Sequence, residues 1–278
     1  MTIMVGYFLA GLVGVSLGIF GAGGSILTVP ILVYVVGISP VLATAYSLLV
    51  VGATSLVGAA SYIRRGEVNI TTAVVFAIPS VIAVYATRRF LVPAIPPEIF
   101  SLGTYVVKRD TLIMLLFGVV MAWAALGMIR AGGSRGQTSS HTAVPASAHT
   151  TEHRPLLIAG EGFLVGGLTG LVGAGGGFLI VPVLVLAAGM KMRQAVGTSL
   201  IIITLKSLVG FAGDLGAGQN IDWTFLTVFA GFAIVGILAG GAISTHVSDA
   251  KVKPLFGWFV LGAGSLIVVS ELLQGGFA

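Results

Sequence analysis

The first 63 residues of the chain, Met1 to Ile63, contain no Asp, Glu, Lys or Arg. A helix needs about 20 apolar residues to cross about 30 Å of hydrocarbon, so this run is long enough for more than one crossing. Charged residues make up 8% of the chain and apolar residues 56%, whereas about 25% of a typical soluble domain is charged. Continuous apolar runs favour helices over the short alternating segments of a β-barrel. The sequence therefore predicts an all-α polytopic membrane protein.

A glycine-rich stretch occurs twice in this chain, at an offset of 152 residues. Residues 18–32 and 170–184 are identical at nine of fifteen positions, and the match continues between residues 43–48 and 195–200. Glycine has a low helix propensity and proline removes a backbone donor, so each copy predicts a helix broken at an unwound turn. We expect two repeats, each with a glycine-broken helix or re-entrant pair followed by about three further spans.

A polar segment separates the two repeats. Residues 131–154 are rich in Gly, Ser, Thr, His and Pro, which is typical of a flexible linker with little to bury. We therefore divide the chain into a first transmembrane repeat (1–130), the linker (131–154) and a second transmembrane repeat (155–278). Three prolines within residues 90–110 predict an interfacial or re-entrant excursion rather than a span.

The positions of Lys and Arg predict the topology, because cytoplasmic loops carry an excess of these residues. If the chain crosses the membrane and returns to its original side within each broken segment, nine basic residues lie on the same side of the membrane as the linker. The other four basic residues then lie on the opposite side of the membrane, at or beyond the end of a span over residues 69–87. They are Arg88, Arg89, Lys108 and Arg109. If each broken segment is one span, the linker side has five and the other side eight. The first arrangement fits better and predicts an inverted repeat, with a cytoplasmic linker and both termini outside.

Broken helices in inverted repeats often form the binding sites of secondary transporters. An unwound turn exposes backbone N–H groups, and the start of a helix carries partial positive charge, so the two breaks predict a site for a small anion. The alternative is that the glycines only allow close helix packing. The backbone candidates are Gly21, Ala22, Gly23, Gly24 and Ser25 in the first copy, and Gly173, Ala174, Gly175, Gly176 and Gly177 in the second.

Polar side chains inside the predicted spans are the second group of candidates. Lys206 is the only basic residue well inside a span, where it would bind an anionic substrate or carry a proton; alternatively it snorkels to the membrane surface or pairs structurally with an acid such as Asp214. Proton coupling is a hypothesis that rests on this lysine alone. Small hydroxyl residues at repeat-related positions are able to bond oxyanion oxygens, although such groups also bond back to their own helix. They are Ser47, Ser55, Thr198, Ser199 and Ser207.

Several functional classes find no support in the sequence. It contains no nucleophile–base set, no paired core carboxylates and no cysteine, so we predict neither enzyme activity, nor a cofactor, nor a metal site. The basic residues lie beside apolar segments and form no patch interleaved with aromatics, which argues against nucleic acid as a partner. The expected partners are the lipid bilayer and a small anionic substrate, and no oligomeric state is predicted.

The sequence resembles the TauE/SafE family of membrane permeases, which includes sulfite and organosulfonate exporters. The resemblance lies in residues 18–24 followed by Pro30, in their copies at 170–177 and Pro182, and in the run 195–199. It implies a secondary carrier that exports small sulfur-containing anions, such as sulfite, sulfonates or sulfoacetate, across the bacterial inner membrane. An anion channel and a non-transporting membrane scaffold or assembly factor are the alternative functions.

Overall fold

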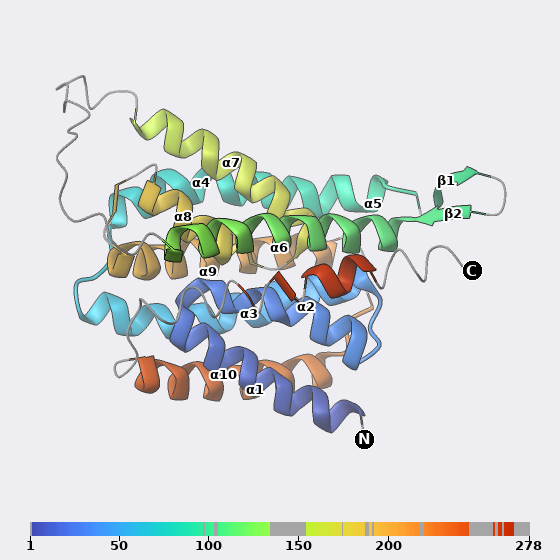
Figure 1. Cartoon of the computed structure of the whole chain (residues 1–278), viewed down its shortest axis with the longest axis horizontal. Coiled ribbons are helices and arrows are strands. Elements are labelled where there is room, and N and C mark those ends of the chain that lie inside the picture. The colour runs from blue at the N-terminus through green and yellow to red at the C-terminus, as the bar shows by residue number, and fades with distance from the viewer. Residues whose placement is uncertain are drawn as a thin grey trace.

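The fold is a bundle of helices that lie roughly along the long axis of the molecule, with a short β-hairpin at one end (Figure 1). The computed structural model describes residues 2–96, 98–102, 105–133, 154–173, 175–186, 189–190, 192–216, 220–244, 258, 261–262 and 264–269. The elements before the linker are α1 (Thr2–Phe20), the 3₁₀ segment η1 (Gly21–Leu27), α2 (Thr28–Pro30), the π-helical segment η2 (Ile31–Val35), α3 (Pro40–Arg64), α4 (Ile70–Ala86), the π-helical segment η3 (Thr87–Leu91), α5 (Val92–Ala94), β1 (Glu98–Leu102), β2 (Tyr105–Lys108) and α6 (Arg109–Gly133). The elements after it are α7 (Arg154–Val172), α8 (Gly177–Leu186), α9 (Met192–Gly216) and α10 (Trp223–Ser244).

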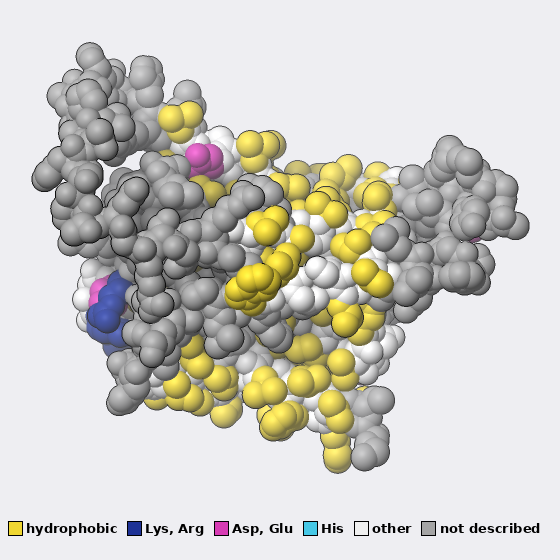
Figure 2. Space-filling model, viewed as in Figure 1, with side chains coloured by type: hydrophobic (Ala, Val, Ile, Leu, Met, Phe, Trp, Pro, Cys, Tyr) yellow, Lys and Arg dark blue, Asp and Glu magenta, His cyan; other side chains and the backbone are white. Residues whose placement is uncertain are grey.

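The outer surface of the bundle is apolar. On α4, the side chains of Ile70, Val74, Ile78 and Ile82 recur every fourth residue and are all exposed. Hydrophobic side chains cover the middle of the face in Figure 2, while the coloured Lys and Arg side chains gather at its left edge. Such an aliphatic surface suits lipid rather than water. Within the described residues, four helical stretches are long and apolar enough to span a membrane: Pro40–Arg64, Ile70–Ala94, Arg193–Leu215 and Trp223–Ile243. The predicted helical membrane protein is therefore confirmed.

The first glycine stretch reverses the direction of the chain. The regular α-helix ends at Phe20, and Gly21–Leu27 form the tighter 3₁₀ segment. Gly24 packs against the backbone of Ser16, in the last turns of α1. Further on, a methyl group built on Gly6 would lie 2.8 Å from Cγ2 of Val36, so the end of η2 lies beside the start of α1. The segment after the break thus runs back along α1 and does not continue as one straight span.

The two halves have helices at matching positions. α1 (Thr2–Phe20) and α7 (Arg154–Val172) differ by the same 152 residues as the glycine stretches, and so do α3 (Pro40–Arg64) and α9 (Met192–Gly216). Their packing partners are exchanged between the halves. Helix α1 packs on α10, while its counterpart α7 packs on α4, which is the counterpart of α10. Each half therefore completes the packing of the other.

Matching helices run in opposite directions through the bundle. Leu48 in α3 packs against Gly210 in α9, and Leu200 packs against Gly58, so α3 and α9 are antiparallel. Helix α1 starts at the right of Figure 1, beside the label N, and runs to the left, whereas α7 runs from left to right.

One prediction made for the first half needs correction, and of the two alternatives given for residues 90–110 the re-entrant one is wrong. The helix that was expected to end near residue 87 continues through η3 and α5 to Ala94, because Phe90, Leu91 and Val92 extend its apolar run. The region after it is an antiparallel β1–β2 hairpin that projects beyond the helices, so it does not re-enter the bundle (Figure 1). Helix α6 ends at Gly133 and α7 begins at Arg154, so the predicted linker lies almost entirely outside the described residues.

Candidate anion-binding site

Lys206 is fully buried in α9, where two long helices cross in the centre of the bundle. Its Nζ donates a hydrogen bond of 2.7 Å to Oγ1 of Thr169 in α7. Among the described residues it forms no ion pair. The alternative that Asp214 pairs with Lys206 is wrong, because Asp214 pairs with a different residue. A charged ammonium inside a membrane protein is costly unless an anion lies close to it.

Arg88 is a second fully buried basic residue, which the sequence interpretation placed at the end of a span. Its Nη1 lies 3.5 Å from Oδ1 of Asp214 and donates a hydrogen bond of 2.9 Å to Oγ1 of Thr44. The residue belongs to η3, and π-helical turns inside α-helices are frequent at functional sites. The pair Arg88–Arg89 resembles a loop signal, but the apolar residues that follow it are the sign that the helix continues.

The second glycine stretch forms a turn bracketed by these two cations. Gly173, Gly175 and Gly176 have φ values of +74°, +66° and +66°, a conformation that other L-residues rarely adopt. A methyl group built on Gly173 would lie 2.6 Å from Nη2 of Arg88, and one on Gly176 would lie 2.6 Å from Nζ of Lys206. Only glycine therefore lets both cations approach the turn this closely.

The start of α8 supplies backbone donors at the same turn. α8 begins at Gly177, which is buried, and the carbonyl of Gly176 already accepts hydrogen bonds from the N–H groups of Leu179 and Ile180. The first N–H groups of a helix have no acceptor within it and carry partial positive charge. Together with the two cations, they form an environment suited to an anion. Ala174, the remaining backbone candidate of this copy, lies outside the described residues.

The first glycine stretch packs against the second. α8 contacts η1, which contains Gly21, Ala22, Gly23, Gly24 and Ser25. Gly24 and Ser25 are buried. The hydroxyl of the neighbouring Thr28 is buried and has no hydrogen-bond partner among the described residues. The two predicted breaks thus meet inside the bundle.

The predicted hydroxyl residues fall into two groups. The hydroxyls of Ser47, Ser55 and Ser207 are buried in α3 and α9 and have no hydrogen-bond partner in the described part of the chain. Ser207 follows Lys206 directly, and α3 crosses α9 next to it, since Leu208 packs on Gly52. These three serines remain candidates for binding an oxyanion.

Thr198 and Ser199 instead have hydrogen-bond partners within the protein. Oγ1 of Thr198 accepts a hydrogen bond of 3.0 Å from the N–H of Asn69, and Oγ of Ser199 donates one of 2.8 Å to the carbonyl of Val196 in its own helix. The hydroxyl of Tyr46, the repeat counterpart of Thr198, accepts a hydrogen bond of 2.6 Å from the N–H of Asp222. In both halves this position fixes the loop that leads into α4 or α10 of the other half.

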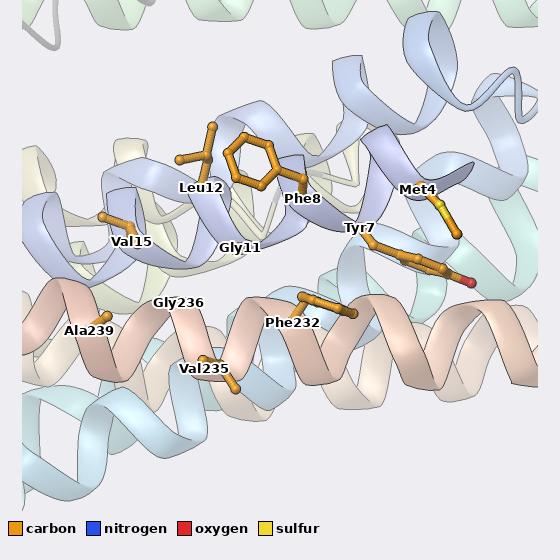
Figure 3. A pocket seen from close by; sticks show the side chains of 10 residues that line it. All are labelled: Met4, Tyr7, Phe8, Gly11, Leu12, Val15, Phe232, Val235, Gly236 and Ala239. Carbon is orange, nitrogen blue, oxygen red and sulfur yellow. The ribbon is translucent and has the colours of Figure 1, made fainter. Parts of the chain in front are cut away.

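A groove of about 520 Å³ between α1 and α10 is a different feature (Figure 3). Apart from the Tyr7 hydroxyl, the side chains that line it are apolar, and several of them are exposed on the outer surface: Met4, Phe8, Leu12, Phe232 and Val235. It offers no charged group to an anion. The polar site therefore lies in the interior of the bundle and not in this groove.

Comparison with known proteins decides the family. The model of the family described as "Sulfite exporter TauE/SafE" matches residues 7–267. The chain belongs to the TauE/SafE family. A "Probable membrane transporter protein" of Xylella fastidiosa (strain 9a5c) is 29% identical over 261 residues, which cover 93% of this chain and 92% of that protein.

Two further relatives come from other organisms. The "Probable membrane transporter protein YunE" of Bacillus subtilis (strain 168) is 26% identical over 250 residues, covering 85% of each chain. The "Probable membrane transporter protein MJ0441" of Methanocaldococcus jannaschii is 26% identical over 225 residues, covering 79% of this chain and 73% of that protein. No solved structure matches the chain. The family resemblance is thus confirmed, and the chain is a multi-pass membrane transporter.

Proposed function

We propose that this TauE/SafE protein is a secondary transporter that exports small sulfur-containing anions, such as sulfite or organosulfonates, across the cell inner membrane. The observation that carries the proposal is Lys206, a fully buried cation without an ion pair among the described residues, next to Gly176 at the glycine turn. An anion bound there would neutralise the lysine and accept hydrogen bonds from the first N–H groups of α8.

The proposed transport cycle uses the two halves as an inverted repeat. Three observations support this arrangement: the matching helix bounds, the exchanged packing of α1 and α7, and the antiparallel crossing of α3 and α9. In transporters built this way, the site lies at the interface of the repeats, and rocking one repeat against the other exposes it to each side in turn. The site described above contains residues of both halves, as alternating access requires. In the proposed orientation both termini are outside and the linker is cytoplasmic.

The full-length protein reconstituted in liposomes provides the test. Saturable flux of sulfite, with competition by a sulfonate such as sulfoacetate, would support the proposal. Absence of flux for sulfite, sulfonate and sulfate alike would refute it. Flux that also responds to an imposed pH gradient would support proton coupling, and flux insensitive to the gradient would exclude it.

An anion channel is distinguished from a carrier by counterflow. For a carrier, unlabelled sulfite inside the liposomes accelerates the entry of labelled sulfite, because the loaded site returns across the membrane. For a channel, flux rises linearly with concentration and shows no such stimulation.

A further inference from the structure

The ion pair between Arg88 and Asp214 is weaker than its burial requires. Both side chains are at most 1% exposed, yet they share one contact, 3.5 Å between Nη1 and Oδ1. Nε and Nη2 of Arg88 and Oδ2 of Asp214 are buried without a hydrogen-bond partner among the described residues. A structural Arg–carboxylate pair in such a place is usually bidentate, with its remaining donors satisfied. This pair leaves three polar atoms unsatisfied.

The unsatisfied Nη2 of Arg88 is directed at the glycine turn. It lies 2.6 Å from the position of a methyl group on Gly173, and Nζ of Lys206 stands in the same relation to Gly176. Gly173 and Gly176 are three positions apart in the chain, so their Cα atoms are at most about 11 Å apart. Both cations therefore lie against one short turn, so an anion bound at this turn lies close to Arg88 or to Lys206.

We propose that Arg88 is a second anion-binding residue of this site and that Asp214 is its resting counter-ion, which the bound anion displaces. This inference rests on the proposed function and adds to it the group that competes with the substrate. Without substrate, Asp214 neutralises Arg88 through a single contact, and Nε and Nη2 stay available. When an oxyanion binds, Nε and Nη2 donate hydrogen bonds to it, and the ion pair between the guanidinium and the carboxylate of Asp214 breaks.

The proposal predicts opposite effects for the two members of the pair. Arg88→Gln removes a charged donor, so the half-saturating sulfite concentration rises by about tenfold or more. Asp214→Asn removes the competing carboxylate, so the half-saturating concentration falls by about threefold or more. A pair with only a structural role predicts a different pattern, in which both substitutions reduce the amount of folded protein and neither tightens binding.

The experiment measures sulfite flux against sulfite concentration in liposomes that contain the full-length protein. Arg64→Gln is the matched control, because Arg64 is an exposed arginine at the end of α3 with no role in the site, and its half-saturating concentration is expected to stay at the wild-type value. Arg88→Lys keeps the charge but not the planar fork, so an intermediate value is expected. If the wild type shows no saturable flux, the proposed function fails, and the assignment of Arg88 fails with it.

The assignment of Arg88 alone fails under two other outcomes. One is a wild-type half-saturating concentration in Arg88→Gln, and the other is weaker binding in Asp214→Asn. Should Arg88→Gln not fold because Asp214 is left unpaired, the double variant Arg88→Gln/Asp214→Asn removes both charges. It is expected to bind sulfite about tenfold more weakly than Asp214→Asn alone, and equal affinity would overturn the proposal.

Discussion

Lys206 is a candidate anion-binding residue because of the residues that surround it in the folded bundle, and not because of its own helix. It is fully buried, and the hydroxyl of Thr169, to which it donates a hydrogen bond, is neutral. By contrast, the buried Arg88 forms an ion pair with an acidic residue, Asp214. In the proposed function, an anion bound beside Lys206 offsets the free-energy cost of burying its charge, which would link folding and binding at this residue.

The substitution Lys206→Met tests this link. It removes the charge and keeps a flexible apolar side chain of similar length, so we expect the half-saturating sulfite concentration to rise about tenfold or more. The thermal midpoint of the purified protein should stay the same or increase, because an uncompensated buried charge is removed. Thr169→Val serves as a control that removes only the hydroxyl, and a smaller effect is expected. Wild-type affinity in Lys206→Met would remove this residue from the site.

The substitution Gly176→Ala tests whether the turn requires glycine. An alanine at φ +66° costs about 1–2 kcal/mol in backbone strain, and its methyl group also meets Thr169 and Lys206. Gly37→Ala is the matched control, since Gly37 has a φ of +83° and nothing within 4 Å of the added methyl group. We expect both variants to lower the thermal midpoint, but only Gly176→Ala to abolish sulfite flux. Normal flux in Gly176→Ala would show that the turn does not bind the substrate.

At the scale of elements, glycines outside the turn serve helix packing. Gly14 in α1 lies against the backbone of Ala233 in α10, and Gly166 in α7 lies against the backbone of Ser80 in α4. These contacts occur at the same repeat position, since Gly14 and Gly166 are 152 residues apart. For these residues the packing interpretation of the glycines is the appropriate one, because small residues let helices approach closely in a membrane.

Two neighbouring glycines of α7, Gly166 and Gly167, provide a test of this close helix packing. Gly166→Ala places a methyl group against Ser80, whereas Gly167→Ala places one where nothing lies within 4 Å. We expect Gly166→Ala to destabilise the protein by about 1–3 kcal/mol, and Gly167→Ala to be neutral or stabilising, since alanine favours helix. Thermal unfolding of the purified proteins measures both. Equal midpoints would contradict the close packing of α7 on α4.

At the scale of the whole molecule, the orientation in the membrane is accessible to cysteine labelling, because the chain contains no cysteine. Antiparallel packing of α3 and α9 puts Ser39 and Asn220 at one end of the bundle, and Thr71 and Gln194 at the other, and all four are exposed. With both termini outside, Ser39→Cys and Asn220→Cys should react with an impermeant maleimide in intact cells. Thr71→Cys and Gln194→Cys should react only after permeabilisation, and the reverse pattern would invert the proposed topology.

The sequence by itself determined the features that depend on local composition and on self-similarity. The uncharged run to Ile63 required membrane-spanning helices, and the repeated glycine stretch marked two helix breaks and a shared plan for both halves. It also identified Lys206, because a lone charge inside an apolar run is conspicuous whatever the fold. These features are visible in one dimension, since lipid solvation and helix propensity act on each segment separately.

Only the tertiary structure decided which polar groups meet. Arg88 looked like the end of a span, and its burial follows from a helix that continues to Ala94 and from Asp214, which lies 126 residues away on α9. The hydroxyl of Thr198, a predicted binding residue, accepts a hydrogen bond from the N–H of Asn69 in the other half, a partner that the sequence does not indicate. Such pairings depend on how distant helices cross, and no local pattern encodes that crossing. The geometry of the site is therefore a property of the packed bundle.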